Sequence, residues 1–298
     1  MMEFMEFTDR IAELLQQKMG DGYTATVTKV LKNNDVTLTG IVIMEKNDSV
    51  SPTIYLEEQY RQYQDGDSVE KIVEEIAALY EHQTRSVKLD MDFFRDYVLV
   101  KERICHKVIN YEKNRKLLQD VPYFRWHDLA VVFYYAMREK ALGKASILIH
   151  NSHLDMWGQQ AEEVYRTARR NMKEHMPDIL VSMQELLKEL AGIQMGESST
   201  ALYVLTNKEK VFGASAMLYS EKIKELADRL GSDLLILPSS VHEVLLLPDD
   251  GIQSYDFYRR MVNEVNMTQV DLEEILSFNL YRYDREKEEI EMIEETAV

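Results

Sequence analysis

The 298-residue sequence has few of the residues that interrupt a chain or cross-link it. Five prolines and eleven glycines are few for this length, which argues against a loop-rich all-β sandwich and favours long regular elements. Cys105 is the only cysteine, so no disulfide can form within the chain. The longest apolar run, residues 129–137, is far shorter than the roughly 20 residues that a membrane-spanning helix needs.

The first ten residues, MMEFMEFTDR, contain neither the basic segment nor the apolar segment of a secretory signal peptide. Together with the single cysteine and the absence of a long apolar run, this predicts a soluble protein of the cytoplasm. Hydrophobic residues make up 45% of the chain, which is enough for a substantial core, so the composition does not favour intrinsic disorder.

Acidic residues far outnumber basic ones. The chain has 52 Asp and Glu against 35 Lys and Arg, which gives a formal charge of -17 and a pI near 4.9. A surface of this sign repels phosphate backbones and anionic lipids, so we expect neither a nucleic acid nor a membrane as a partner. The charge fits a basic protein partner, and it also fits an inhibitor that mimics the charge of DNA.

Residues 1–85 predict a lobe built from a helix, a β-hairpin and further helices. Apolar residues at helical spacing predict an amphipathic helix over residues 3–19. Two alternating β-branched runs flank the Asn-Asn-Asp turn at residues 33–35 and predict the hairpin. Asp67 and Glu70 have the spacing of a capping box at the start of a later helix.

Residues 86–284 predict a larger α+β domain, and residues 285–298 predict a charged tail that is either a frayed helix or disordered. Paired strands with helices between the pairs predict mostly antiparallel sheets with helices packed on their faces. Among these elements we expect a helix over residues 179–190 and a strand over residues 211–218. The sequence leaves open whether the lobe and the domain form one continuous architecture.

The stretch LPSSVHEVLLLPDD, residues 237–250, brings two serines, a histidine and a glutamate together. On a strand, alternation puts Ser240 and His242 on one face and Glu243 on the other, which excludes a simple Ser-His-Glu triad. A catalytic pair of His242 with Ser240 or Ser239 stays open. The favoured interpretation is a β-turn that leads into a core strand, with the hydroxyls bonded to local backbone groups.

His150 and His153 lie three residues apart where a predicted strand gives way to a helix. With Asp155 they offer metal-binding side chains, and together with Glu243 they are candidates for contacts to a ligand. The favoured alternative is a helix capped at residues 151–152, with both histidines at the surface. Because no further ligand set accompanies the two histidines, we expect no metal.

Trp126, His127 and Asp128 place an imidazole beside a carboxylate, as in a histidine oriented by an acid. Neighbouring residues on a strand face opposite ways, so the favoured interpretation is the start of a strand with Trp126 in the core. The sequence has no phosphate-binding glycine loop, dinucleotide fingerprint, kinase signature or calcium loop, and we expect no cofactor.

Six long blocks cover nearly the whole chain: TVTKVLKNNDVTLTGI (26–41), SPTIYLEEQYRQYQDG (51–66), HKVINYEKNRKLLQDVPYFRWHDLAVVFYY (106–135), ILIHNSHLDMW (147–157), YVLTNKEKVFGASAMLY (203–219) and LPSSVHEVLLLP (237–248). Together they resemble an uncharacterised family of clostridial gut-bacterial proteins, a domain of unknown function. The resemblance implies no activity, cofactor or catalytic residue. It favours one architecture for the whole chain.

Three hypotheses about function follow. The first is a non-catalytic module that binds a protein partner or a small ligand through a groove near residues 237–243 and 150–155. The second is a hydrolase-type enzyme that uses His242 with Ser239 or Ser240. The enzyme requires His242 to lie within hydrogen-bond reach of a serine and of a separate carboxylate, in a pocket. The third is an acidic inhibitor that mimics DNA.

Overall fold

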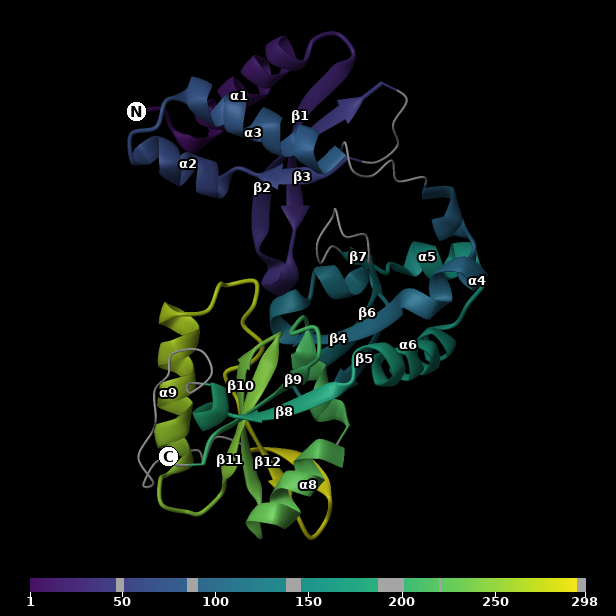
Figure 1. Cartoon of the computed structure of the whole chain (residues 1–298), viewed down its shortest axis with the longest axis vertical. Coiled ribbons are helices and arrows are strands. Elements are labelled where there is room, and N and C mark those ends of the chain that lie inside the picture. Colours follow the sequence, from purple (N-terminus) through teal and green to yellow (C-terminus); the bar gives the residue numbers. More distant parts are fainter. Residues whose placement is uncertain (47–50, 85–90, 138–145, 187–200, 220, 294–298) are drawn as a thin grey trace.

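The described residues form three antiparallel sheets with helices packed against them, as seen in a computed structural model (Figure 1). This arrangement confirms the predicted α+β class. No helix in the described ranges combines the length and the hydropathy that crossing a bilayer requires. The structure describes residues 1–46, 51–84, 91–137, 146–186, 201–219 and 221–293.

The N-terminal lobe packs two helices against a small sheet and confirms the predicted helix and hairpin. Phe7 and Ile11 of the first helix meet Ile41 of the sheet and Ile72 of the last helix in one buried cluster. The elements of the lobe are α1 (Phe4–Met19), β1 (Tyr23–Leu31), β2 (Thr37–Glu45), β3 (Thr53–Tyr55), α2 (Glu57–Gln64) and α3 (Val69–Thr84).

The predicted capping box at the start of α3 is wrong by one residue. Because α3 begins at Val69, the cap position falls on Ser68, whose Oγ accepts from the backbone N–H of Lys71 at 3.3 Å. The Asp67 carboxylate instead binds the Lys71 ammonium at 2.8 Å.

The second sheet has β6 at its centre. It pairs with β4 along one side, and with β5 and then β7 along the other. Both faces of β6 are covered, so its apolar run is buried without alternation. The elements of this part are α4 (Tyr97–Val100), β4 (Ile104–Asn110), β5 (Tyr123–Trp126), β6 (Leu129–Ala136), β7 (Ser146–Leu148), α5 (Asn151–Trp157) and α6 (Ala161–His175).

The third sheet has six strands in the order β13-β12-β10-β11-β9-β8. Alternation along β10 puts Leu234 and Ile236 in the cluster that includes α8, and Leu235 and Leu237 in the cluster that includes α9. The elements are β8 (Asp178–Ser182), β9 (Tyr203–Asn207), the 3-10 helix η7 (Gly213–Leu218), α8 (Glu221–Leu230), β10 (Leu234–Ser240), β11 (Glu243–Pro248), α9 (Tyr255–Thr268), β12 (Leu280–Asp284) and β13 (Glu289–Ile293).

The second and third sheets share a hydrophobic core. Val108 and Val131 from the second sheet belong to the same buried cluster as Leu205 and Leu246 from the third. The described part of residues 91–293 is therefore joined by apolar packing, whereas the N-terminal lobe has a buried cluster of its own.

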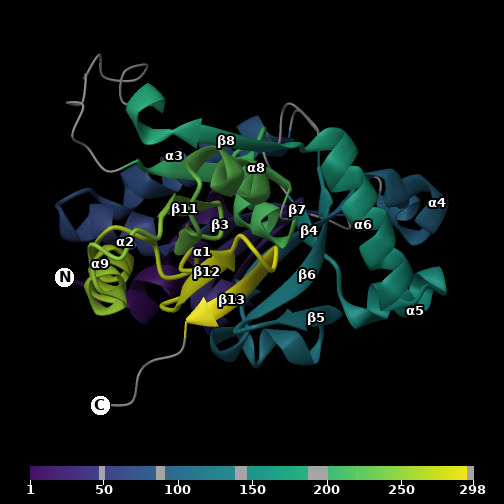
Figure 2. The ribbon, with the colours of Figure 1, turned by 90° about the horizontal axis from the view of Figure 1, so that it is seen from below.

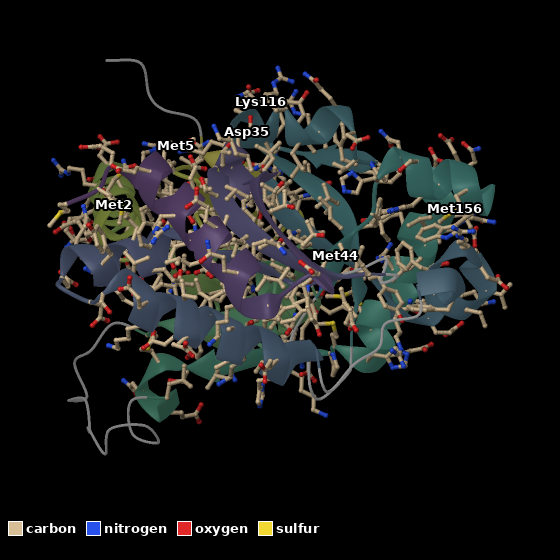
Figure 3. The ribbon with its side chains drawn as sticks, turned by 90° about the horizontal axis from the view of Figure 1, so that it is seen from above. Met2, Met5, Asp35, Met44, Lys116 and Met156 are labelled. Carbon is tan, nitrogen blue, oxygen red and sulfur yellow. The ribbon has the colours of Figure 1, made fainter. Side chains whose placement is uncertain are left out.

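The tip of the β1–β2 hairpin connects the N-terminal lobe to the rest. Asn34 has a φ of 60°, which asparagine tolerates, and its side-chain amide donates to the carbonyl oxygens of Leu272 and Ile275 at 2.8 and 2.7 Å. Asp35 accepts from the backbone N–H of Lys116 at 3.2 Å, and Figure 3 shows these two residues side by side. The predicted Asn-Asn-Asp turn is thus also a joint between distant parts of the chain.

Two predicted elements near the third sheet are corrected. Residues 179–182 of the predicted helix belong to β8, because they pair with β9, whereas residues 183–186 are helical as predicted. Residues 187–190 of that helix lie outside the described residues. Residues 213–218 form η7 rather than a strand. Phe212 turns the chain at a φ of 53°, and the small buried side chains that follow fit a tight helix.

The predicted charged tail is also corrected. Residues 289–293 form β13, which pairs with β12 over its whole length, instead of a frayed helix or a disordered segment. Ile290 and Met292 pack on the shared core while Glu289 and Glu291 are exposed, which is the alternation of a half-buried strand. Residues 294–298 lie outside the described residues.

Candidate functional site

His242 lies in the two-residue turn between β10 and β11. Because β10 ends at Ser240 and β11 begins at Glu243, the strand alternation that placed Ser240 and His242 on one face does not reach the histidine. The pairing slips between Pro238 and Ser240, so Ser239 lies in a β-bulge. The Ser240 hydroxyl oxygen accepts from the backbone N–H of His242 at 3.0 Å, the role that the β-turn interpretation gives it.

Both ring nitrogens of His242 are engaged by distant parts of the chain. Nδ1 accepts from the backbone N–H of Phe212 at 3.1 Å, which leaves the proton of the neutral ring on Nε2. Nε2 lies 3.2 Å from the Glu274 carboxylate and donates to it. The Phe212 ring stacks on the imidazole with their centroids 5.5 Å apart. A remote carboxylate therefore orients His242, while Ser240 bonds its backbone rather than its ring.

The backbone around this histidine is fixed as tightly as its ring. An aromatic residue at a φ of 53°, as Phe212 has, is an uncommon and strained conformation. A Cβ on the next residue, Gly213, would lie 2.1 Å from Thr206 Oγ1 and 2.6 Å from the His242 carbonyl oxygen. Thr206 donates to that same carbonyl oxygen at 2.7 Å. These contacts fix the backbone conformation of the turn that carries His242.

Lys107 of β4 lies beside the same turn. Its ammonium nitrogen is 4.3 Å from the centroid of the Phe212 ring. Burial, assisted by the positive charge of Lys32 and opposed by the Glu273 carboxylate, lowers the pKa of Lys107 from 10.5 to about 8. The lysine is thus held where its charged form is disfavoured.

We expect Lys107→Met to raise the free energy of unfolding at pH 7 by about 1 to 2 kcal/mol, because the charged ammonium leaves water on folding. Between pH 8 and 10.5 the unfolded chain binds more protons than the folded chain, so the free energy of unfolding of the wild type rises with pH. The advantage of the variant over the wild type therefore shrinks as the pH rises. Urea unfolding at pH 7 and about pH 10 measures the difference. Lys29→Met, on an exposed position of β1, is the control. A Lys107→Met variant that is less stable than the wild type at pH 7, by the same amount as at pH 10, would contradict the expectation.

His150 and His153 stand at the start of α5, where His153 Nδ1 accepts from the backbone N–H of His150 at 3.0 Å. His150 Nδ1 lies 2.8 Å from the carboxylate of Asp120, and burial lowers the pKa of His153. Asp155 is exposed. Within the described ranges, no group of three or more His, Cys, Asp or Glu side chains is placed to hold a metal ion.

The structure does not bring the two predicted halves of the groove together. Both views show α5, which carries residues 150–155, well away from β10 and β11, which carry residues 237–243 (Figure 1 and Figure 2). The His150 pair packs beside Phe94, in a different hydrophobic cluster from the strands of the third sheet.

A pocket of about 520 Å³ lies between α9 and the third sheet, and we call it the α9 pocket. Leu237, Leu245 and Leu247 line it from β10 and β11. Of the predicted site residues, Ser239 lines the pocket, whereas His242 packs against Phe212 near η7. None of the described side chains that line it is acidic or basic.

Sequence reasoning missed the helical wall of this pocket. Phe257, Met261 and Val265 line it from α9 and remain 43%, 37% and 38% exposed. They lie one turn apart along the helix, directly beside the half-buried Tyr258 and the buried Val262. The sequence of α9 therefore has two adjacent apolar rows, whereas a helix needs only one to pack on a single sheet. The second row was the available signal for a helix face that is left partly uncovered.

Comparison with known proteins identifies the family of the chain. The model of a family described as a family of unknown function (DUF5688) matches residues 4–285. Curated proteins and solved structures gave no significant match. The resemblance drawn from the six sequence blocks is thereby confirmed for a family of unknown function, and the clostridial origin stays a prediction.

Proposed function

We propose that this chain, which belongs to the DUF5688 family of unknown function, is a binding module that holds a small, mostly apolar molecule in the α9 pocket. The observation that carries the proposal is a concave site of about 520 Å³ whose described lining is uncharged and largely aliphatic or aromatic. Sites of this size and character are typical of proteins that enclose small ligands.

The driving force for binding comes from the α9 side of the pocket. Phe257, Met261 and Val265 keep more than a third of their surface in water. Covering apolar surface contributes roughly 25 cal/mol for each Å² removed from water. An apolar ligand that reaches these three side chains and the leucines of the sheet would therefore gain contacts on both walls.

The hydrolase hypothesis receives less support. It requires a hydrogen bond between a serine hydroxyl and the imidazole of His242, yet the two ring nitrogens bond the Phe212 backbone N–H and the Glu274 carboxylate. Ser240 instead accepts from a backbone N–H, and Ser239 lies in the α9 pocket without the histidine. The described geometry uses His242 to hold a turn in place.

The net charge of -17 favours a basic protein over a nucleic acid as a macromolecular partner. This partner and the DNA-mimic inhibitor stay predictions. Because none of the described pocket-lining side chains carries a charge, a basic partner would use a different surface from the small ligand.

We expect the neutral fluorescent probe N-phenyl-1-naphthylamine to bind the protein with one site per chain. Met261→Glu should weaken binding roughly tenfold or more, because the new carboxylate must be desolvated against the ligand. Met267→Glu is the matched control, since Met267 is on the same helix, is 71% exposed and does not line the pocket. Fluorescence titration measures the affinities.

Equal affinity in wild type and in Met261→Glu would overturn this proposal, because the probe would then bind elsewhere. The elution volume in size-exclusion chromatography tests a second occupant. A wild-type dimer that Met261→Glu converts to a monomer, combined with no probe binding, would show that another copy of the chain covers the α9 pocket.

A further inference from the structure

We infer that the ligand of the α9 pocket is an uncharged, mainly aliphatic molecule with a hydroxyl group, and that Asn266 Oδ1 accepts the hydrogen bond of this hydroxyl. The inference rests on the proposed function, since it names the chemistry of the molecule held there. It depends on the buried Asn266 side-chain oxygen, which has no hydrogen-bond partner among the described residues, and on the absence of charge among the described lining residues.

Asn266 is a pocket-lining residue near the end of α9 and is only 1% exposed. Its side-chain amide nitrogen donates to the carbonyl oxygen of Ser277 at 2.9 Å, which fixes the orientation of the amide. Its Oδ1 is buried and accepts no hydrogen bond from the described residues. A buried acceptor without a donor is unfavourable, so this oxygen gains most from a ligand that brings one.

The rest of the lining sets the other properties of the ligand. The described side chains there include no lysine, arginine or histidine to neutralise an acid, and no carboxylate to neutralise an amine. A charged head group would therefore be desolvated without a partner, which strongly disfavours it. A hydroxyl supplies the missing donor without a charge, and an aliphatic remainder matches Leu237, Val262 and their neighbours.

The orientation of Asn266 is held by residues that do not belong to the pocket lining. The hydroxyl of Ser277, whose carbonyl receives the Asn266 amide, donates to Asp128 at 2.6 Å. The residue that bonds the amide is therefore itself anchored to the second sheet. This support keeps Oδ1 in place before a ligand arrives, and an acceptor that is already oriented binds more tightly.

Displacement of N-phenyl-1-naphthylamine by 1-decanol and by decyl methyl ether tests the inference in the wild-type protein. The two compounds share a chain and an oxygen, and only the alcohol can donate. We expect the alcohol to bind about five to ten times more tightly, the effect of one hydrogen bond to an otherwise unpaired buried acceptor. In Asn266→Leu this preference should disappear, whereas Ser239→Ala, another polar lining residue, should retain it.

The outcomes separate the two proposals. If neither the probe nor either compound binds, the proposed function fails. If both compounds bind and the ether equals or exceeds the alcohol, the pocket binds apolar molecules but the inference is wrong. If Ser239→Ala alone abolishes the preference, the acceptor is Ser239 and not Asn266. The wild-type comparison stands even if Asn266→Leu fails to fold, which thermal unfolding followed by circular dichroism reveals.

Discussion

Replacing Asp128 with asparagine is expected to lower the free energy of unfolding by about 3 kcal/mol. The carboxylate accepts from the Ser277 hydroxyl at 2.6 Å, the Asn279 side-chain amide at 2.9 Å and the Tyr281 hydroxyl at 2.5 Å. Burial and the charge of Asp128 raise the pKa of Tyr281, so its phenol stays protonated and keeps donating. Asparagine has nearly the same shape but offers one acceptor oxygen and places an NH₂ group against donors.

Urea unfolding of wild type and variant, followed by circular dichroism, measures this loss. Asp120→Asn is the matched control. The Asp120 carboxylate also bonds a side chain, that of His150, but it is 70% exposed, so water can replace the lost contact. Exposed pairs of this kind contribute about 0 to 1 kcal/mol. A loss below 1 kcal/mol for Asp128→Asn would show that the three donors find water instead, and that the Asp128 carboxylate contributes little to joining the second and third sheets.

Replacing Gly213 with alanine is expected to destabilise the protein by about 3 kcal/mol or more. The new Cβ would lie 2.6 Å from both the Asn207 backbone nitrogen and the His242 carbonyl oxygen. These are backbone atoms of β9 and of the β10–β11 turn, so no side-chain rotation relieves the collision. The chain must shift, and the stacked contact between Phe212 and His242 is disturbed with it.

Gly22→Ala is the control for this substitution, because a Cβ there meets no heavy atom within 4 Å and the residue is not in the left-handed region. Differential scanning calorimetry of both variants measures the effect. If Gly213→Ala unfolds at the wild-type temperature, the close approach of η7 to the His242 turn is not part of the stable fold.

Local signals were sufficient for the parts of the fold that pack on their own neighbours in sequence. The amphipathic α1 and the hairpin at residues 33–35 carry their own period and their own turn residues, and both were predicted correctly. β8 and η7 were not, because a strand pairing with β9 and the tight packing of Gly213 depend on partners distant in the chain.

In the candidate site, too, local features could be predicted from the sequence and contacts between distant residues could not. The exclusion of a simple Ser240-His242-Glu243 triad assumed strand alternation, whereas His242 lies in a turn. The partners of its ring, Phe212 and Glu274, lie about thirty residues away on either side. Residues 126–128 were predicted to start a strand, but Trp126 ends β5, and Asp128 lies in the turn before β6, where it bonds residues distant in sequence. The α9 pocket depends on which of two apolar rows on one helix remains uncovered, and periodicity alone does not decide that.

The donors that meet Asp128 are encoded 149 to 153 residues after it. At a synthesis rate of roughly 5 to 20 residues per second, about 8 to 30 seconds pass between the two on the ribosome. During this interval the growing chain contains the second sheet without β12 and β13, and Val131 and Leu129 have only part of their final cover. Synthesis of residues 280–293 therefore supplies the two strands that complete the interface between the second and third sheets.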